Sequence, residues 1–157
     1  MRKDPLCGLV FALAACAKPY YRPYGDGIGY SEVGVGKNAY EVMYTGAADQ
    51  DELTAKKYAI TRAAEIGRRN NFAYFQIENA NARQDESKEV IKQAEHYGPG
   101  YPYRYGWRDE TDVRVYSRVE KKPVVKLRVE YRNDDCETCL SVDAKLQEAI
   151  QSGILMP

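Results

Sequence analysis

The feature that most constrains this fold is the alternation of apolar and polar residues in the last third of the chain. Valines recur at odd positions in 111–120, and Val125, Leu127, Val129 and Tyr131 alternate with charged or polar residues in 124–132. Successive side chains of a strand point to opposite faces, so this period predicts strands with one buried and one wet face. Such strands are typical of antiparallel sheets. We expect a hairpin here, with 121–123 (Lys-Lys-Pro) as its turn.

A helix is predicted over 53–69, which contains no proline and repeats small residues such as Ala59 and Ala63 at four-residue spacing. Asp49 lies three residues before Glu52, an arrangement expected of a helix N-cap. The order of strands and helices predicts an α+β fold of two layers, a mostly antiparallel sheet with helices packed on one face. The other expected elements are strands over 28–35, 40–45 and 72–77, a helix stop at Asn70-Asn71 and a helix over 141–151. We expect 28–157 to form a single domain.

The segment at about 80–110 differs in composition from the rest of this domain. It is polar up to Glu95 and then becomes dense in Gly, Pro and aromatic residues. We interpret it as an inserted loop, with a short helix possible over 87–95. Its rings could stack on sugars or contact another protein, and the alternative is a loop that only covers a sheet edge. The predicted binding residues are Tyr101, Tyr103, Tyr105 and Trp107.

The N-terminus indicates export and lipid attachment. A basic start precedes the apolar run 6–15, which is too short to span a membrane and is typical of a signal peptide. The run ends in Leu13-Ala-Ala-Cys16, a pattern similar to the lipobox of bacterial lipoproteins, so Cys16 is the predicted lipidation site. Ala17 favours the outer membrane, with the domain facing the periplasm. Prolines and glycines in 16–27 predict a tether that can reach about 30 Å from the bilayer.

Several segments together resemble a known family. These are the lipobox, the segments 27–32, 40–46 and 58–65, and the pair Tyr74-Phe75. They are similar to segments of a group of small proteobacterial envelope lipoproteins of the Caulobacter type. The resemblance covers most of the mature chain. The resemblance implies an envelope lipoprotein. It implies no activity, because none is established for that group.

Cys136 and Cys139 form a CxxC pair between a predicted strand and a predicted helix. A thioredoxin-like redox domain would need further elements after the motif, and only 18 residues remain. Neighbouring acids also disfavour a reactive thiolate. We expect a small structural disulfide, and redox exchange and metal binding remain alternatives. A metal site would need two more ligands, and His96 is the only histidine.

No catalytic group, metal site or cofactor is predicted. Arg62 and Glu65 are three residues apart on the expected helix and are interpreted as an ion pair. The formal net charge is zero, which disfavours nucleic acid as a partner. We therefore expect a non-enzymatic envelope lipoprotein that binds a protein or cell-wall component, such as peptidoglycan. The alternative is a redox or metal-handling accessory that uses the cysteine pair.

Overall fold

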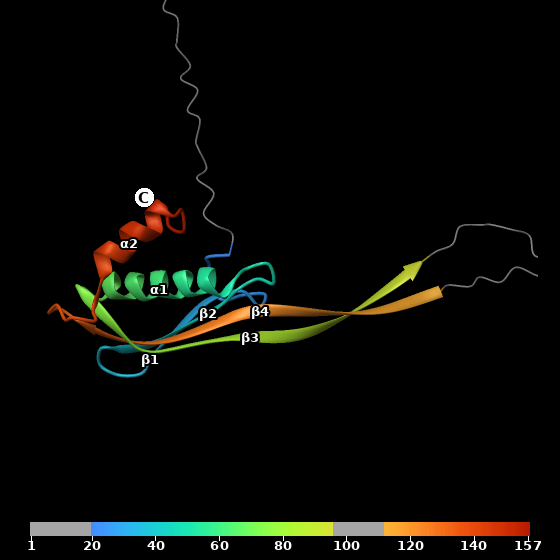
Figure 1. Ribbon diagram of the computed structural model, residues 1–157, viewed down its shortest axis with the longest axis horizontal. Coiled ribbons are helices and arrows are strands. Elements are labelled where there is room, and N and C mark those ends of the chain that lie inside the picture. Colours follow the sequence, from blue (N-terminus) through green and yellow to red (C-terminus); the bar gives the residue numbers. More distant parts are fainter. Residues whose placement is uncertain (1–19, 96–111) are drawn as a thin grey trace, which may run out of the picture.

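The computed structural model describes residues 20–95 and 112–157 and has the predicted α+β fold. Its five strands form one antiparallel sheet in the order β1-β2-β4-β3-β5. Both helices lie on the same side of this sheet (Figure 1). The elements are β1 (Gly29–Gly34), β2 (Ala39–Thr45), α1 (Glu52–Arg69), β3 (Tyr74–Glu95), β4 (Asp112–Arg132), β5 (Leu140–Ser141) and α2 (Val142–Gln151).

Helix α1 confirms the predicted helix, with a different N-cap. The side chain of Asp51, rather than Asp49, accepts a hydrogen bond from the backbone N–H of Thr54 at 2.6 Å. Asp51 is the residue directly before the first helical turn, where a carboxylate can reach the free N–H groups. Asn71 ends the helix with a φ of +59°, as the predicted left-handed stop requires.

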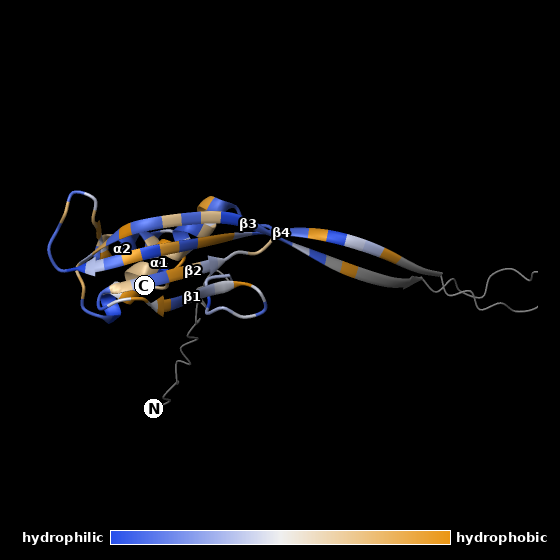
Figure 2. Cartoon of the chain, turned by 90° about the horizontal axis from the view of Figure 1, so that it is seen from below, coloured by the Kyte–Doolittle hydropathy of each residue, from blue (hydrophilic) through white to orange (hydrophobic). Residues whose placement is uncertain are grey.

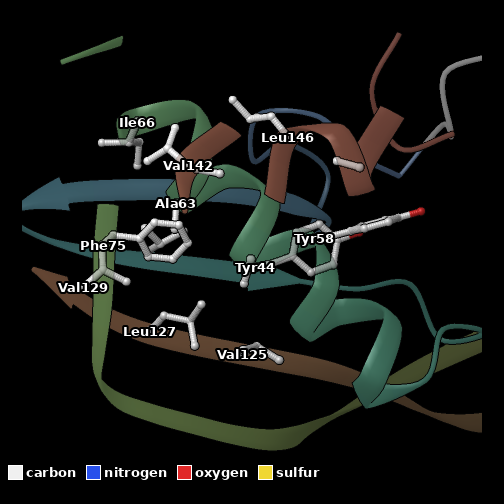
Figure 3. Packing of buried hydrophobic residues seen from close by; sticks show 14 of the residues in the cluster. Tyr44, Tyr58, Ala63, Ile66, Phe75, Val125, Leu127, Val129, Val142 and Leu146 are labelled. Carbon is white, nitrogen blue, oxygen red and sulfur yellow. The ribbon is translucent and has the colours of Figure 1, made fainter. Parts of the chain in front are cut away.

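The core lies between the inner face of the sheet and α1. β2 contributes Val42 and Tyr44, β4 contributes Leu127 and Val129, and all four are fully buried. Figure 3 shows Tyr44, Leu127 and Val129 together with labelled side chains of α1. Each fully buried valine or leucine contributes roughly 1.5–3 kcal/mol of transfer free energy. The hydrophobic helix partners are four alanines and two larger residues, namely Ala55, Ala59, Ala63, Ala64, Tyr58 and Ile66.

Gly67 lets α1 lie close to both of its neighbours. A Cβ at this position would stand 2.7 Å from Val142 Cγ2 on α2 and 3.1 Å from the Tyr131 ring on β4. The Tyr131 hydroxyl also donates a hydrogen bond to the carbonyl of Ala63 at 2.7 Å. Helix α1 is thereby fixed between the sheet and α2.

The hairpin of β3 and β4 corrects two expectations. Residues 80–95 are part of β3 and not of a loop, and 87–95 contain no helix. Residues 121–123 are not a turn either, because β4 runs without interruption through Pro123. The carbonyl of Pro123 accepts a hydrogen bond from Gly46 N–H at 2.8 Å, which is the last one between β4 and the β2 side. Proline has no backbone N–H to donate, but β2 ends opposite Val124, so no β2 residue is left without a donor and Pro123 is tolerated.

Among residues 20–95 and 112–157, no further strand lies beside the outer part of this hairpin. β2 reaches only to Val124 of β4, and β5 pairs only with Tyr74 and Phe75 of β3. The ladder then continues as two strands from Asp85 opposite Lys122 to Glu95 opposite Asp112. We call these residues, 85–95 and 112–122, the arm. At about 3.3 Å per residue the arm extends about 40 Å beyond the end of β2 opposite Val124 (Figure 1).

Candidate functional site

Two of the predicted sites lie outside the described residues. These are the lipidation site, Cys16, and the aromatic residues predicted to bind a partner, which are Tyr101, Tyr103, Tyr105 and Trp107. Both stay predictions. The cysteine pair lies within the described structure.

The cysteine pair forms the predicted disulfide, in the turn between β4 and β5. The Cα atoms of Cys136 and Cys139 are 5.0 Å apart, and Cys139 N–H donates to the Cys136 carbonyl at 3.1 Å. Gln76 of β3 donates from Nε2 to Thr138 Oγ1 at 3.0 Å, which ties the turn to the sheet. The bridge therefore closes the turn that leads into α2.

The surroundings of this disulfide are acidic. The Cys136 N–H donates to Asp135 Oδ1 at 2.8 Å, and Asp134 and Glu137 are its sequence neighbours. Negative charge disfavours the thiolate on which redox exchange depends. Within residues 20–95 and 112–157, no group of three or more His, Cys, Asp or Glu side chains could hold a metal ion.

Residues 20–27, which we call the docked segment, pack against the domain. The expectation of a free tether is wrong for these residues. Tyr24 N–H donates to the Tyr30 carbonyl, and Tyr30 N–H donates to the Arg22 carbonyl, each at 2.8 Å. Gly29 permits this approach, because a Cβ there would lie 2.5 Å from the Arg22 carbonyl oxygen. The prolines exclude a long strand, but two backbone hydrogen bonds to β1 still form.

Tyr21 holds the docked segment against α1. Its ring centroid is 5.0 Å from that of Tyr30 and 5.5 Å from that of Tyr58, and its hydroxyl donates to Glu65 Oε2. Burial raises the pKa of Tyr21 far above its ordinary value, and the hydrogen bond to Glu65 raises it further. Tyr21 therefore keeps its proton at any physiological pH.

Arg62 joins this contact to β1. Its Nε and Nη2 each donate to Glu32 at 2.8 Å, and Nη1 donates to Glu65 at 2.9 Å. The guanidinium also lies 4.3 Å from the centroid of the Tyr30 ring, an arrangement that favours a cation–π interaction. We call Tyr21, Tyr30, Glu32, Arg62 and Glu65 the Arg62 cluster. The predicted Arg62–Glu65 ion pair is confirmed.

The electrostatics of the Arg62 cluster make it a fixed contact. The hydrogen bonds from Arg62 hold the pKa of Glu32 below its ordinary value, although partial burial opposes this, and Arg69 lowers it further from 3.1 Å. The Arg62 and Glu32 side chains are only 16% and 19% exposed. The cluster therefore connects the docked segment and the adjacent strand β1 to α1, where Arg62 is 30 positions from Glu32.

The arm is the other prominent surface. Figure 2 shows hydrophobic residues continuing along it, beyond the part of the sheet that the helices cover. The exposed large apolar side chains on the arm are Val90, Val115, Tyr116 and Val119, at 58%, 60%, 48% and 46% exposure. Exposed apolar side chains gathered on one projection are typical of a binding surface.

Comparison with protein-family models, with curated proteins and with solved structures finds no match for this chain. The resemblance to envelope lipoproteins therefore stays a prediction. No helix within the described ranges is both long and apolar enough to cross a bilayer.

Sequence reasoning missed Glu32 and the docking of Tyr21. Glu32 is 30 positions from Arg62, and nothing local in the sequence links them. Val115 and Val119 were recognised as part of an alternating strand, but their expected burial is wrong. Val115 and Val119 lie on the same face of β4 as the buried residues Val125 and Leu127. They are exposed because neither of the described helices extends over the arm.

Proposed function

We propose that this chain is a lipid-anchored, non-enzymatic protein of the bacterial envelope that binds a protein partner or cell-wall component through its arm. The observation that carries the proposal is the arm itself. It reaches about 40 Å beyond β2 and carries exposed Val90, Val115 and Val119. The aromatic segment 96–111 connects its two strands, so the predicted binding residues follow directly from it in the chain.

Anchoring is supported by the lipobox-like ending at Cys16, and the outer membrane is favoured by Ala17. The docked segment begins four residues after Cys16. An anchored chain would therefore be attached to its domain through the Arg62 cluster, with the domain in the periplasm.

A non-enzymatic role is supported by the state of the half-buried charged groups. General acid–base catalysis needs a group whose pKa lies near the working pH. In the Arg62 cluster the pKa of Tyr21 lies far above neutrality and that of Glu32 lies below its ordinary range. Both are also fully engaged with internal partners, which favours a structural role for the cluster.

A redox or metal-handling role of the cysteine pair is the second candidate. It is favoured by the position of the disulfide in an exterior turn where both cysteines are only half-buried. It is disfavoured by the acidic neighbours Asp134, Asp135 and Glu137, which oppose thiolate formation. Thiol-exchange activity of the purified protein toward a model disulfide would favour this candidate.

Two measurements test the proposal. Mass spectrometry of the membrane fraction should find a mature chain that begins at acylated Cys16, and a soluble product that retains residues 1–15 would contradict anchoring. Replacing Tyr103 and Trp107 with Ala should weaken recovery of envelope proteins or peptidoglycan, with a loss of about 1–3 kcal/mol and an unchanged thermal midpoint. Tyr24→Ala removes an exposed ring from the docked segment and serves as the matched control. Unchanged recovery by the double variant would contradict binding through these rings.

A further inference from the structure

Within the part of the chain that the structure describes, the outer edge of β4 along the arm has no strand beside it, and we call it the free edge. In an antiparallel strand each residue directs its N–H and C=O to one neighbouring strand, and alternate residues serve opposite neighbours. The Pro123 carbonyl accepts from Gly46 N–H, and Tyr131 N–H donates to the Asn38 carbonyl, each at 2.8 Å. The backbone N–H and C=O groups of odd-numbered β4 residues therefore point toward β2. β2 ends opposite Val124, so no strand of the described chain pairs with the backbone groups that Val115, Ser117 and Val119 direct to that side.

The outer edge of β3 is more strongly protected than this one. Over the part of the arm that pairs with 115–119, β3 reads Lys-Glu-Val-Ile-Lys at 88–92 and has three charged residues, and charge on an edge strand opposes pairing with another chain. The β4 stretch 115–119 reads Val-Tyr-Ser-Arg-Val and has one charge. A two-stranded ribbon is only marginally stable in water, so a third strand would stabilise the arm.

We propose that the β4 edge of the arm pairs antiparallel with the same edge of a second copy of this chain, about a two-fold axis at Ser117. The geometry selects this register. The free edge spans 112–122, so its midpoint is residue 117, and a copy centred there uses the whole edge without meeting β2. Ser117 is odd-numbered, so the central pair would exchange two backbone hydrogen bonds.

The same register is chemically self-complementary. It places Val115 opposite Val119 of the second copy, twice, and Tyr116 opposite Arg118, where a cation–π contact can form. The inference goes beyond the proposed function and does not depend on lipid attachment.

Cysteine crosslinking of the full chain tests the axis. In the proposed dimer the two Ser117 Cα atoms are about 5.5 Å apart, within the disulfide range of about 4.4–6.8 Å. Ser117→Cys should therefore give a covalent dimer under mild oxidation, above the background of the unchanged chain. Ser87→Cys is the matched control, because Ser87 lies on β3 and its copies would be more than about 14 Å apart. Equal crosslinking at both positions, or none at Ser117, would overturn the proposal.

A charge-exchange pair of variants tests the register. Val115→Lys with Val119→Lys places like charges opposite each other twice, and we expect dimerisation in detergent to weaken roughly tenfold by sedimentation velocity. Val115→Glu with Val119→Lys places opposite charges there and should restore it. Failure of the Glu/Lys variant to exceed the Lys/Lys variant would refute this register, and a monomeric parent chain would refute self-pairing. If the Ser117→Cys variant forms a disulfide adduct with a different protein and none with itself, self-pairing is refuted in favour of another occupant. None of these outcomes depends on acylation of Cys16.

Discussion

Removing the cation from the Arg62 cluster gives the sharpest test of how the docked segment, β1 and α1 are held together. We consider Arg62→Met, which keeps most of the side-chain stem and removes the guanidinium. The substitution deletes three hydrogen bonds of 2.8–2.9 Å, two to Glu32 and one to Glu65. It leaves two carboxylates close together without their shared cation.

The magnitude follows from the burial of these groups. Removing one partner of a fully buried ion pair costs about 3–5 kcal/mol, whereas an exposed pair contributes about 0–1 kcal/mol. Arg62, Glu32 and Glu65 are 16%, 19% and 28% exposed, which is closer to the buried case. Water still screens them in part, so we expect the free energy of unfolding to fall by about 2–3 kcal/mol at pH 7.

The loss should depend on pH with a definite sign. The pKa of Glu32 is lowered in the folded chain, so this group stabilises the fold above its ordinary pKa. That stability is lost as the pH falls through the folded value. In Arg62→Met the lowering that Arg62 causes is removed and only that from Arg69 is left, and protonation of Glu32 relieves the repulsion between the carboxylates. The difference between parent and variant should therefore shrink below about pH 4.

Urea unfolding followed by circular dichroism, at pH 7 and near pH 3.5, measures both effects. Arg68→Met is the matched control, because Arg68 lies on the same helix and its partner Asp143 is 83% exposed. We expect this control to lose at most about 0.5 kcal/mol. A loss in Arg62→Met no larger than in the control, or one that is equally large at low pH, would refute the reasoning.

Two further predictions concern the fold. Gly67→Ala should lower the free energy of unfolding by about 1–3 kcal/mol, because its Cβ would stand 2.7 Å from Val142 Cγ2. Thermal unfolding measures this, and an unchanged or raised midpoint would mean that the contact relaxes without cost. Replacing Cys136 and Cys139 with Ser should cost at most about 2 kcal/mol, since the bridge closes a loop with a sequence separation of 3. Thiol labelling should find both cysteines protected until a reductant is added, and free labelling of the oxidised protein would contradict the bridge.

The globular part of the fold could be predicted because its signals are local. The four-residue spacing of Ala59 and Ala63 identifies α1, and alternation at 125–131 identifies the inner face of β4. Asn71 could be predicted as a helix end because its side chain tolerates a positive φ. These features depend on neighbours within a few residues.

The arm and the docked segment could not be predicted in the same way. Residues 79–88 of β3 are all exposed, so no buried face imposes an alternating pattern on them. Lys121-Lys122-Pro123 has the composition of a turn, and only the end of β2 explains why a strand accepts Pro123. Tyr21 reaches Glu65 across 44 positions, and a segment rich in Pro and Gly gives no local sign of that partner.

The docked segment also shortens the connection between Cys16 and the domain. With a lipid on Cys16, only three residues separate the anchor from Tyr20, and the four steps from Cys16 to Tyr20 span at most about 14 Å. While Tyr21 stays bound, the domain is therefore kept nearer the bilayer than a free tether would allow. Release of the eight docked residues would add roughly 25 Å of slack. The Arg62 cluster thus decides whether the connection to the membrane is short or long, and tension between the anchor and the arm would act first on the contacts of Tyr20 and Tyr21, which lie nearest Cys16 in the docked segment.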